Sequence, residues 1–497
     1  MASKGPPSRP GETERTPPFH SMGVGLESSR TFAIWRHGSM CGMADLTGIR
    51  VELIPEFEAE ENARFVAERP RSLELLERAR GSMPRGVPMV WMDDLYEHAP
   101  LVVERGQGAT FTDVDGHTYL DMYIADMSGF CGHAPRPVVE AVKRRITIGN
   151  QFLLPSTDAV AVAEHLASRY DMPKWQFTLS ATQANTEVIR LARRATGREV
   201  ILMFDGKYHG HGDATLVVLE DGMVLPEQQG LPRSVTNHAR IVQFNDIDAL
   251  ERALAPRDVA LVLTEPAMTN IGIVAPEPGF HETLRQLTRD AGTLLAIDET
   301  HTLVAAYGGL TTELGLQPDF VTVGKSIAAG VPLGAYGMTD DIAALIATPD
   351  EHWLVGGVQV AEVALGGTLF ANALSMAAGR AALVEVLTEE AFERTGSLGA
   401  ALADGIEEAF SDFGLPWSVS RLGAHAYYTF APGPSRNAIE YRAADHPGLR
   451  ALMRIWMANR GVWESGWWLG PTVSVAHTPD DVSRYLDVFR GFLAAVT

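Results

Sequence analysis

The feature that most constrains the fold is a series of five short apolar runs in the middle of the chain. Each run is rich in Val, Ile, Leu or Phe, which is typical of strands that are buried on both faces. Stretches with helical patterning separate the runs, and this alternation predicts right-handed crossovers and a mostly parallel sheet in an α/β fold. The expected strands are residues 177–179, 200–204, 260–264, 293–297 and 320–323, and the expected helices between them are 185–195, 246–254 and 282–291.

The segments on either side of this region predict a second, smaller unit. A helix is expected over 58–80, broken at Pro70, because proline lacks the N–H that a helix interior needs. The C-terminal part mixes helices (375–386 and 395–410) with strands (424–430 and 472–475), which indicates an α+β domain. We therefore expect a flexible extension at 1–42, an N-terminal segment of the small domain at 43–115, the large domain at 116–374 and the C-terminal small domain at 375–497.

Composition excludes several classes of protein. Of the 497 residues, 46% are hydrophobic and the formal net charge is −21. Such acidity repels phosphate backbones, so nucleic acid is not expected as a partner. No apolar run is long enough to span a membrane, the N-terminus lacks the apolar core of a signal peptide, and only two cysteines are present. These features favour a reduced, cytoplasmic protein. Residues 1–42 are either a flexible arm or lie upstream of a start at Met43.

Polar residues follow directly after the predicted strands. Ligands of open α/β sheets bind beyond the carboxyl ends of the strands, so these side chains are expected to meet in one crevice. They are Ser180, Ala181 and Thr182 after the first strand, Tyr208 and His209 after the second, Glu265, Asp298, and finally Lys325.

Asp298 and Lys325 are the most informative pair. A carboxylate at the end of an apolar strand needs a cation or donor, and a protonated pyridine nitrogen would serve; the alternative is a helix cap. Burial of a lysine favours its neutral, nucleophilic amine, which can bond to an aldehyde cofactor, although most lysines at strand ends are solvated.

The remaining strand-end residues complete a cofactor site. Ser180, Ala181 and Thr182 precede a helix whose free N–H groups could cradle a phosphate, and Tyr208 could lie on a planar ring. An amine, a carboxylate and a phosphate cradle together are what pyridoxal 5′-phosphate (PLP) requires.

Nine blocks in order resemble the class III aminotransferases of the fold-type-I PLP enzymes, in the branch of glutamate-1-semialdehyde aminomutase and its transaminase relatives. The resemblance runs from about Ser82 to the C-terminus. Its blocks are DVDGHTYLD (113–121), GHAPRPVVEAV (132–142), SATQAN (180–185), YHGHGD (208–213), EP (265–266), DETHT (298–302), GKSIAAGVPLGAYG (324–337), GGTLFANALSMAAG (366–379) and AHTPDD (476–481).

The resemblance implies a role for each matched residue. Lys325 would form the Schiff base and move protons, Asp298 would face the ring nitrogen, and Tyr208 would lie against the ring. Ala181 and Thr182 would contact the phosphate, with Ser180 and His209 nearby, and Glu265 would lie near the cofactor oxygen or the substrate. Thr368 would reach the phosphate of the neighbouring subunit, which implies an obligate homodimer with shared active sites.

Some positions depart from the family pattern. Ala181 replaces a glycine and Gln183 a glutamate, while Thr300 replaces a valine that packs on the ring. His301 replaces Met or Gln, and it is either a residue behind the cofactor or a structural histidine.

The substrate side also departs from the family. Where relatives that bind amino acids carry an arginine, this chain has Met89, Val90 and Trp91, and the nearby Arg85 occupies a turn. Together with Trp463, Trp467 and Trp468, this indicates a partly aromatic pocket for a hydrophobic amine or amino acid, unless the tryptophans only pack the core.

The sequence therefore predicts a transaminase that works by ping-pong transfer between an amino donor and a keto acid. An aminomutase or a racemase would use the same residues. A transcriptional regulator is disfavoured because residues 1–80 hold no basic helix pair, and no GxGxxG or metal-binding motif points to an NAD or metal site.

Overall fold

The computed structural model describes residues 44–347, 353–355, 358–360, 365–464 and 468–497. Its centre is a seven-stranded sheet in the order β4-β12-β11-β10-β9-β5-β8. The strands β11, β10, β9, β5 and β8 are parallel, whereas β12 runs antiparallel to both of its neighbours. The strands are β4 (Lys174–Thr178), β5 (Val200–Phe204), β8 (Ala239–Val242), β9 (Val259–Thr264), β10 (Leu294–Asp298), β11 (Phe320–Val323) and β12 (Gly334–Met338).

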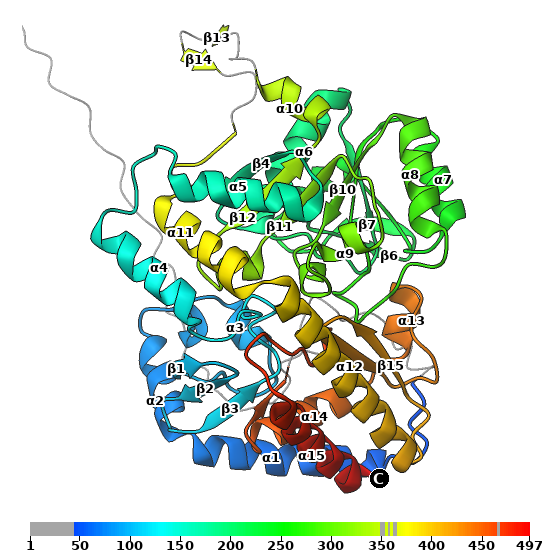
Figure 1. Ribbon diagram of the computed structural model, residues 1–497. Helices are drawn as coiled ribbons and strands as arrows, with labels where there is room; N and C mark the ends of the chain where they lie inside the picture. The colour runs from blue at the N-terminus through cyan, green and yellow to red at the C-terminus, as the bar shows by residue number, and fades with distance from the viewer. Residues whose placement is uncertain (1–43, 348–352, 356–357, 361–364, 465–467) are drawn as a thin grey trace, which may run out of the picture.

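Helices cover both faces of this sheet (Figure 1). Alternate residues of β5 point to opposite faces, so that Leu202 and Phe204 pack with α7 and α8 while Ile201 and Met203 pack with α6. The helices of the large domain are α4 (Arg136–Thr147), α5 (Thr157–Tyr170), α6 (Ala181–Thr196), α7 (Ile247–Leu254), α8 (Phe280–Ala291), α9 (Gly309–Glu313), α10 (Asp340–Ala347) and α11 (Ala373–Ala381). Two hairpins, β6 (Val217–Glu220) with β7 (Met223–Pro226) and β13 (Trp353–Val355) with β14 (Val358–Val360), lie outside the main sheet.

A smaller domain is built from both ends of the chain. Its four-stranded sheet has the order β1-β2-β3-β17, so a C-terminal strand pairs with three N-terminal ones, and β3 lies beyond the boundary expected after residue 115. The strands are β1 (Val103–Gln107), β2 (Thr110–Asp113), β3 (Thr118–Asp121), β17 (Val462–Trp463) and the hairpin of β15 (Ser418–Leu422) and β16 (His425–Thr429). The helices are α1 (Ile54–Glu68), α2 (Pro70–Ala79), α3 (Trp91–Asp94), α12 (Glu389–Asp412), α13 (Ala438–Ala443), α14 (Pro447–Ala458) and α15 (Pro479–Val496).

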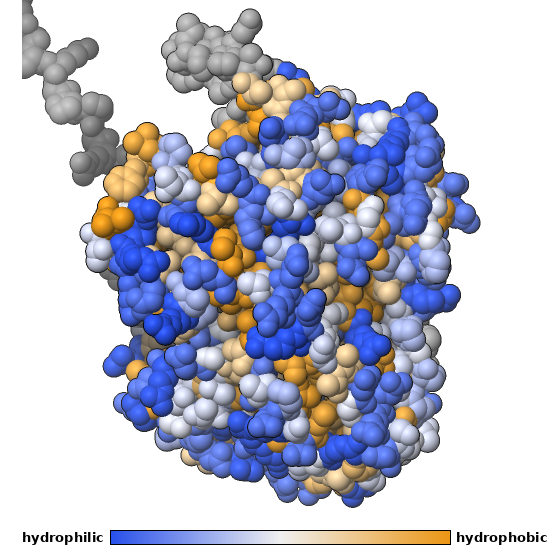
Figure 2. Space-filling model, viewed as in Figure 1, coloured by the Kyte–Doolittle hydropathy of each residue, from blue (hydrophilic) through white to orange (hydrophobic). Residues whose placement is uncertain are grey.

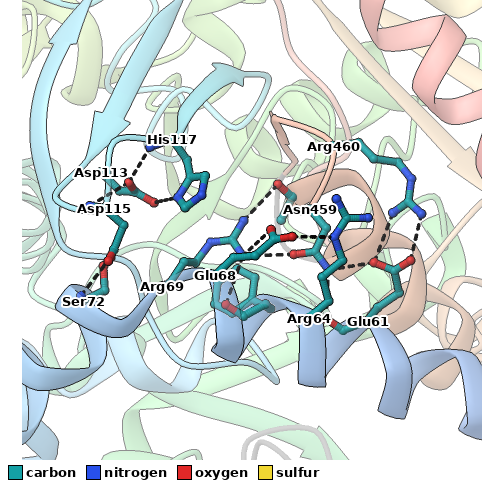
Figure 3. A network of polar contacts seen from close by, with 12 residues as sticks. Glu61, Arg64, Glu68, Arg69, Ser72, Asp113, Asp115, His117, Asn459 and Arg460 are labelled. Atoms are coloured by element: carbon teal, nitrogen blue, oxygen red, sulfur yellow. Dashed lines mark hydrogen bonds and ion pairs between the residues drawn. The ribbon is translucent and has the colours of Figure 1, made fainter.

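A buried polar network joins the two ends of the chain (Figure 3). The guanidinium of Arg69 donates to Tyr119 Oη (2.8 Å) and to Asn459 Oδ1 (3.1 Å). Asn459 and Arg460 in turn donate to Glu61 on α1, at 2.7 and 2.8 Å. A buried charge is tolerated only when its donors are paired, so these contacts fix α1 against the segment after α14.

Most expected elements are confirmed, with bounds that differ by a few residues. The helix over 58–80 is interrupted at Pro70, as predicted, and begins earlier, at Ile54. The strand expected at 472–475 is wrong: only Thr472 forms an isolated bridge, because Thr472, Val473 and Val475 donate to three different segments. The helix expected at 375–386 ends as α11 at Ala381 and continues as a π-helical turn, Ala382–Val386.

Some of the sequence expectations concern residues outside the described ranges. These are the extension at 1–42, the possible start at Met43, and Trp467. None of the helices in the described part of the chain combines the length and the apolar character that a membrane span needs.

Candidate active site

A cavity of about 380 Å³ opens at the carboxyl ends of the parallel strands. It is the crevice that the sequence predicts, because most of the strand-end residues reach it. Those lining it are Ser180, Ala181, Thr182, Tyr208, Glu265, Asp298, His301 and Lys325. His209 does not line the cavity but bonds to Asp298, and Thr368 is exposed and is not among the lining residues of its own chain.

Asp298 ends β10 and is 3% exposed. Its Oδ2 accepts hydrogen bonds from Asn185 Nδ2 (2.8 Å) and His209 Nδ1 (2.9 Å), and its Oδ1 accepts from the backbone N–H (3.0 Å) and hydroxyl (2.5 Å) of Thr300. Burial opposes ionisation, but the bonds from His209, Thr300 and Asn185 outweigh it and lower the pKa of this carboxyl to about 2. Asp298 is therefore a buried, ionised carboxylate facing the cavity. It does not cap the short 3-10 helix Thr302–Val304 that follows, whose N-cap position is His301 and which has no side-chain cap.

The N-terminus of α6 forms another wall of the cavity. Ser180 is the N-cap, and its side chain accepts from Gln183 N–H. The first N–H groups of a helix have no acceptor within it, which leaves those of Ala181 and Thr182 for a ligand. Ala181 is not among the described residues with positive φ, so alanine is tolerated where the family has glycine. Gln183 binds its own turn, accepting from Leu179 N–H (3.0 Å).

Two glycines keep this helix end open. A Cβ on Gly210, which has φ +92°, would lie 2.3 Å from the hydroxyl oxygen of Thr182. A Cβ on Gly324 would lie 3.2 Å from the backbone nitrogen of Ala181. Only glycine therefore allows the chain to pass beside the helix terminus without filling the space in front of it.

Lys325 begins a short 3-10 helix (Lys325–Ala328) just after β11, with a strained φ of 48°. Its side chain is 18% exposed, and its amine donates a short hydrogen bond to Asp126 Oδ2. Asp126 also lies 3.5 Å from His301 Nε2, and His301 Nδ1 is 3.0 Å from the Thr269 hydroxyl. Burial, and then the charge of Lys325, lower the pKa of His301, which favours a neutral imidazole.

Glu265 follows β9 and is 3% exposed. Its Oε2 accepts from the backbone N–H of Thr269 (3.1 Å) and from the hydroxyl of the same residue. Its Oε1 lies buried without a hydrogen-bond partner among the described residues. Burial raises the pKa of this carboxyl to about 8, so Glu265 holds a proton at neutral pH.

The substrate residues expected from the sequence divide into two groups. Trp91 on α3 packs on Tyr208, with ring centroids 5.6 Å apart and planes tilted by 33°. Met89 is 46% exposed, and Arg85 forms an ion pair with Asp94 at the surface. None of the three residues lines the cavity itself, and Trp91 is linked to it through its contact with Tyr208.

The aromatic pocket expected from the C-terminal tryptophans is wrong for Trp463. This residue packs inside the small domain against Tyr96, with ring centroids 4.8 Å apart. Trp468 is partly buried against the same core. Aromatic composition alone does not reveal which way a side chain points.

Sequence reasoning missed three contributors, Asn185, Thr269 and Asp126. Asn185 lies in the SATQAN block, and its place one turn into a helix beside the strand ends could have identified it. Thr269 and Asp126 lie in irregular loops, where no periodicity gives their direction. Within the described residues, no group of three or more side chains that bind metals comes together.

Residues 92–445 match the family described as aminotransferase class III. The chain belongs to this family. It is 34% identical to a glutamate-1-semialdehyde 2,1-aminomutase of Anaeromyxobacter dehalogenans over 79% of this chain and 90% of the relative.

Two solved structures are also similar. A glutamate-1-semialdehyde aminomutase from Pseudomonas aeruginosa PAO1, in complex with PMP, has a TM-score of 0.85 and 36% identity, covering 90% of this chain and all of the other. An omega-transaminase from Sphaerobacter thermophilus has a TM-score of 0.77 and 30% identity, covering 85% and 97%. The fold-type-I assignment and the aminomutase-like branch expected from the sequence are confirmed.

Membership in this family confirms PLP as the cofactor. The cavity fits it: Asp298 offers an ionised carboxylate to a protonated ring nitrogen, and the open N-terminus of α6 offers N–H groups to a phosphate. The glycines at 210 and 324 leave the space that the phosphate needs.

The protonated state of Glu265 makes the stability of the cofactor-free protein depend on pH. The folded protein keeps this proton up to pH about 8, whereas the unfolded chain loses it near the ordinary value of 4.5. The free energy of unfolding should therefore fall as pH rises between these values, by up to about 1.4 kcal/mol per pH unit. In Glu265→Gln the decline should be shallower, as measured by urea unfolding across this range.

Glu313→Gln is the control, because Glu313 is an exposed residue on α9. Its free energy of unfolding should depend on pH in the same way as that of the wild type. A Glu265→Gln profile as steep as the wild-type one would contradict a neutral Glu265.

Proposed function

We propose that this chain is a PLP-dependent transaminase that moves an amino group between a hydrophobic or non-standard amine or amino acid and a keto acid. When bound, PLP supplies an aldehyde that reacts with amines and a ring that withdraws electrons from the substrate carbon. The observation that carries the proposal is that Lys325 and a buried, ionised Asp298 line the same cavity.

In this proposal each residue has a distinct task. Asp298 would keep the ring nitrogen protonated, while His209, Asn185 and Thr300 hold its carboxylate in place. The amine of Lys325 carries protons to and from the substrate carbon.

Other groups hold the cofactor and the substrate. The N-terminus of α6 would hold the phosphate, and Tyr208, which lines the cavity, would contact the ring. The phenol stays neutral because burial, and then the charge of Asp126, raise the pKa of Tyr208 to about 12. Glu265 can donate a hydrogen bond because it is protonated.

An aminomutase is the second candidate, and similarity favours it. The curated relative and one of the solved structures described above bear that name, although the other is a transaminase. The pocket favours the transaminase, because none of the described residues that line the cavity is an arginine. Trp91, which lies in the segment where the resemblance implies an arginine, packs on Tyr208. A racemase would use the same residues as an aminomutase.

The need for an amino acceptor separates these reactions. A transaminase should stop after one equivalent of donor per site and resume when a keto acid is added. Steady turnover of a single substrate without an acceptor would instead indicate an aminomutase or a racemase. Stopped-flow absorbance of the bound cofactor, followed by product analysis, measures both outcomes.

Reduction of the same holoenzyme with borohydride, followed by peptide mapping, should find the cofactor on Lys325. Lys207 serves as the internal control. It is also buried near the site, but its Nζ is held by Thr215 O (2.6 Å) and Glu227 (3.2 Å). A cofactor attached to Lys207 would contradict the assigned roles.

Trp91 is the residue whose replacement should change the donor preference. We expect the wild type to prefer hydrophobic amines to glutamate-1-semialdehyde. In Trp91→Arg, kcat/KM for hydrophobic amines should fall by about ten-fold or more, and kcat/KM for donors that carry a carboxylate should rise. The reason is that a guanidinium pairs with a carboxylate and not with apolar groups. Met92→Arg, on the exposed side of the same helix, should leave both values unchanged. Faster turnover of glutamate-1-semialdehyde by the wild type would contradict this preference.

We also infer a homodimer in which Thr368 reaches the phosphate site of the partner subunit. Apolar side chains are exposed in and beside the connection between α4 and α5; Figure 2 shows orange residues at the upper left edge, where Figure 1 draws this connection. They are Ile146, Ile148, Phe152, Leu153 and Leu154, with exposures from 54% to 71%. Gln151 Nε2 donates to Thr368 O (2.5 Å), so this apolar surface adjoins the segment of Thr368.

Subunit complementation tests this arrangement. Lys325→Ala and Thr368→Ala homodimers should both be weakly active, but mixed dimers should recover activity, because one of the two sites then has both wild-type residues. Sedimentation should find a dimer for each preparation. A monomer, or mixed dimers no more active than the parents, would contradict shared sites.

A further inference from the structure

The loop after β3 contains an unusual backbone feature. Four consecutive residues that are not glycine have positive φ: Ile124 (45°), Ala125 (49°), Asp126 (56°) and Met127 (64°). Such residues are unfavourable in this region because the Cβ approaches the following carbonyl oxygen, and they normally occur singly. A left-handed turn of four therefore requires strong support from its surroundings, and strain of this kind is often found at functional sites.

The turn is supported without any help from the Asp126 side chain. Asp121 Oδ1 accepts from the backbone N–H groups of Tyr123 (3.2 Å) and Ile124 (2.7 Å), and its other oxygen lies 2.8 Å from His133 Nε2. The N–H of Gly129 closes the turn by donating to Ile124 O (2.8 Å). The side chains of Ile124 and Met127 are buried in the core.

The side chain of Asp126 is directed at the catalytic lysine instead. Its Oδ2 accepts from Lys325 Nζ, its Oδ1 lies 3.5 Å from His301 Nε2, and no bond to its own turn is found. The carboxylate is 24% exposed, and Oδ1 has no hydrogen-bond partner among the described residues.

The other charged groups around Lys325 have separate partners. Asp298 is held by its own donors and faces the ring nitrogen in the proposed function, and Glu265 is protonated. His301 is favoured in its neutral form, and the phenol of Tyr208 is neutral. Of the carboxylates described here, Asp126 is therefore the one that can act as counter-ion to the Lys325 amine.

We propose that Asp126 is a positioning residue that receives the amine of Lys325 whenever this amine is not bonded to the cofactor. This inference rests on the proposed function, in which the amine of Lys325 carries protons to and from the substrate carbon. Asp126 holds the charged amine at a fixed place beside the cavity, so that it neither turns toward solvent nor pairs with Asp298. The strained turn is what carries the carboxylate to that place.

The test uses cofactor-free protein, so that it does not depend on turnover. Amines are labelled with acetic anhydride at several pH values from about 6 to about 9, and the extent at each lysine is read by mass spectrometry. Asp126→Asn removes the charge but keeps a residue that tolerates positive φ. Because the neutral amine is the form that reacts, Lys325 should be labelled about three- to ten-fold faster in this variant than in the wild type.

The controls separate the loss of the Asp126 charge from a general change in the folding of the protein or in the reactivity of its lysines. Asp221→Asn makes the same substitution at another residue with positive φ (49°), which is exposed and distant in sequence from the site; it should leave Lys325 labelling unchanged. Lys143 and Lys174, both well exposed, are internal references that should be labelled equally in all proteins. Asp126→Gly removes the charge and also relieves the turn, so it should reproduce the effect of Asp126→Asn even if the latter folds poorly.

Equal labelling of Lys325 in the wild type, Asp126→Asn and Asp126→Gly would overturn the proposal. Faster labelling of the reference lysines as well would also overturn it, because the effect would then be one of folding. If borohydride mapping finds the cofactor on another lysine, the proposed function fails, but the labelling result still reports whether Asp126 holds Lys325.

Discussion

The buried carboxylate of Asp298 is the interaction on which the arrangement of the site depends. It ends β10, yet its donors come from α6 through Asn185, from the segment after β5 through His209, and from the turn that follows it through Thr300. An unpaired charge at this depth would be strongly unfavourable, so these segments must keep their relative positions. Asn185 also accepts from the Thr322 hydroxyl of β11 (2.8 Å), which extends the same network to the strand that precedes Lys325.

The charges around the cavity are kept apart in space. Asp298 is held by its own hydrogen-bond donors, and Asp126 lies beside Lys325. Glu265, which also lines the cavity, avoids a third negative charge by keeping its proton. A chain with a net charge of −21 does not attract a phosphate through its overall field. The phosphate must therefore be held by local geometry, which in the proposed function is that of the N-terminus of α6 with its flanking glycines.

The parts of this molecule that could be predicted from the sequence are those governed by a repeating pattern. Strands buried on both faces, such as β9, produce unbroken apolar runs, and the residues after them fall at one edge of the sheet, which is why Asp298 and Lys325 could be identified. β12 was not expected because its sequence, GAYGM, contains two glycines although all its residues are buried. Asp126 could not be found because its direction depends on a left-handed turn that no local pattern encodes.

The position of Trp91 suggests how enzymes with a common site can differ in substrate. The residues around the cofactor come from strand ends of the large domain, where burial and hydrogen bonding leave little freedom. Trp91 comes instead from α3, a single turn in the N-terminal segment, and meets the site only through its contact with Tyr208. Under the proposed function, a substitution of Trp91 would change the charge and shape beside Tyr208 without disturbing Asp298 or its donors. If Trp91 sets the donor preference, as proposed, this preference is free to vary through the N-terminal segment while the chemistry at the strand ends stays the same.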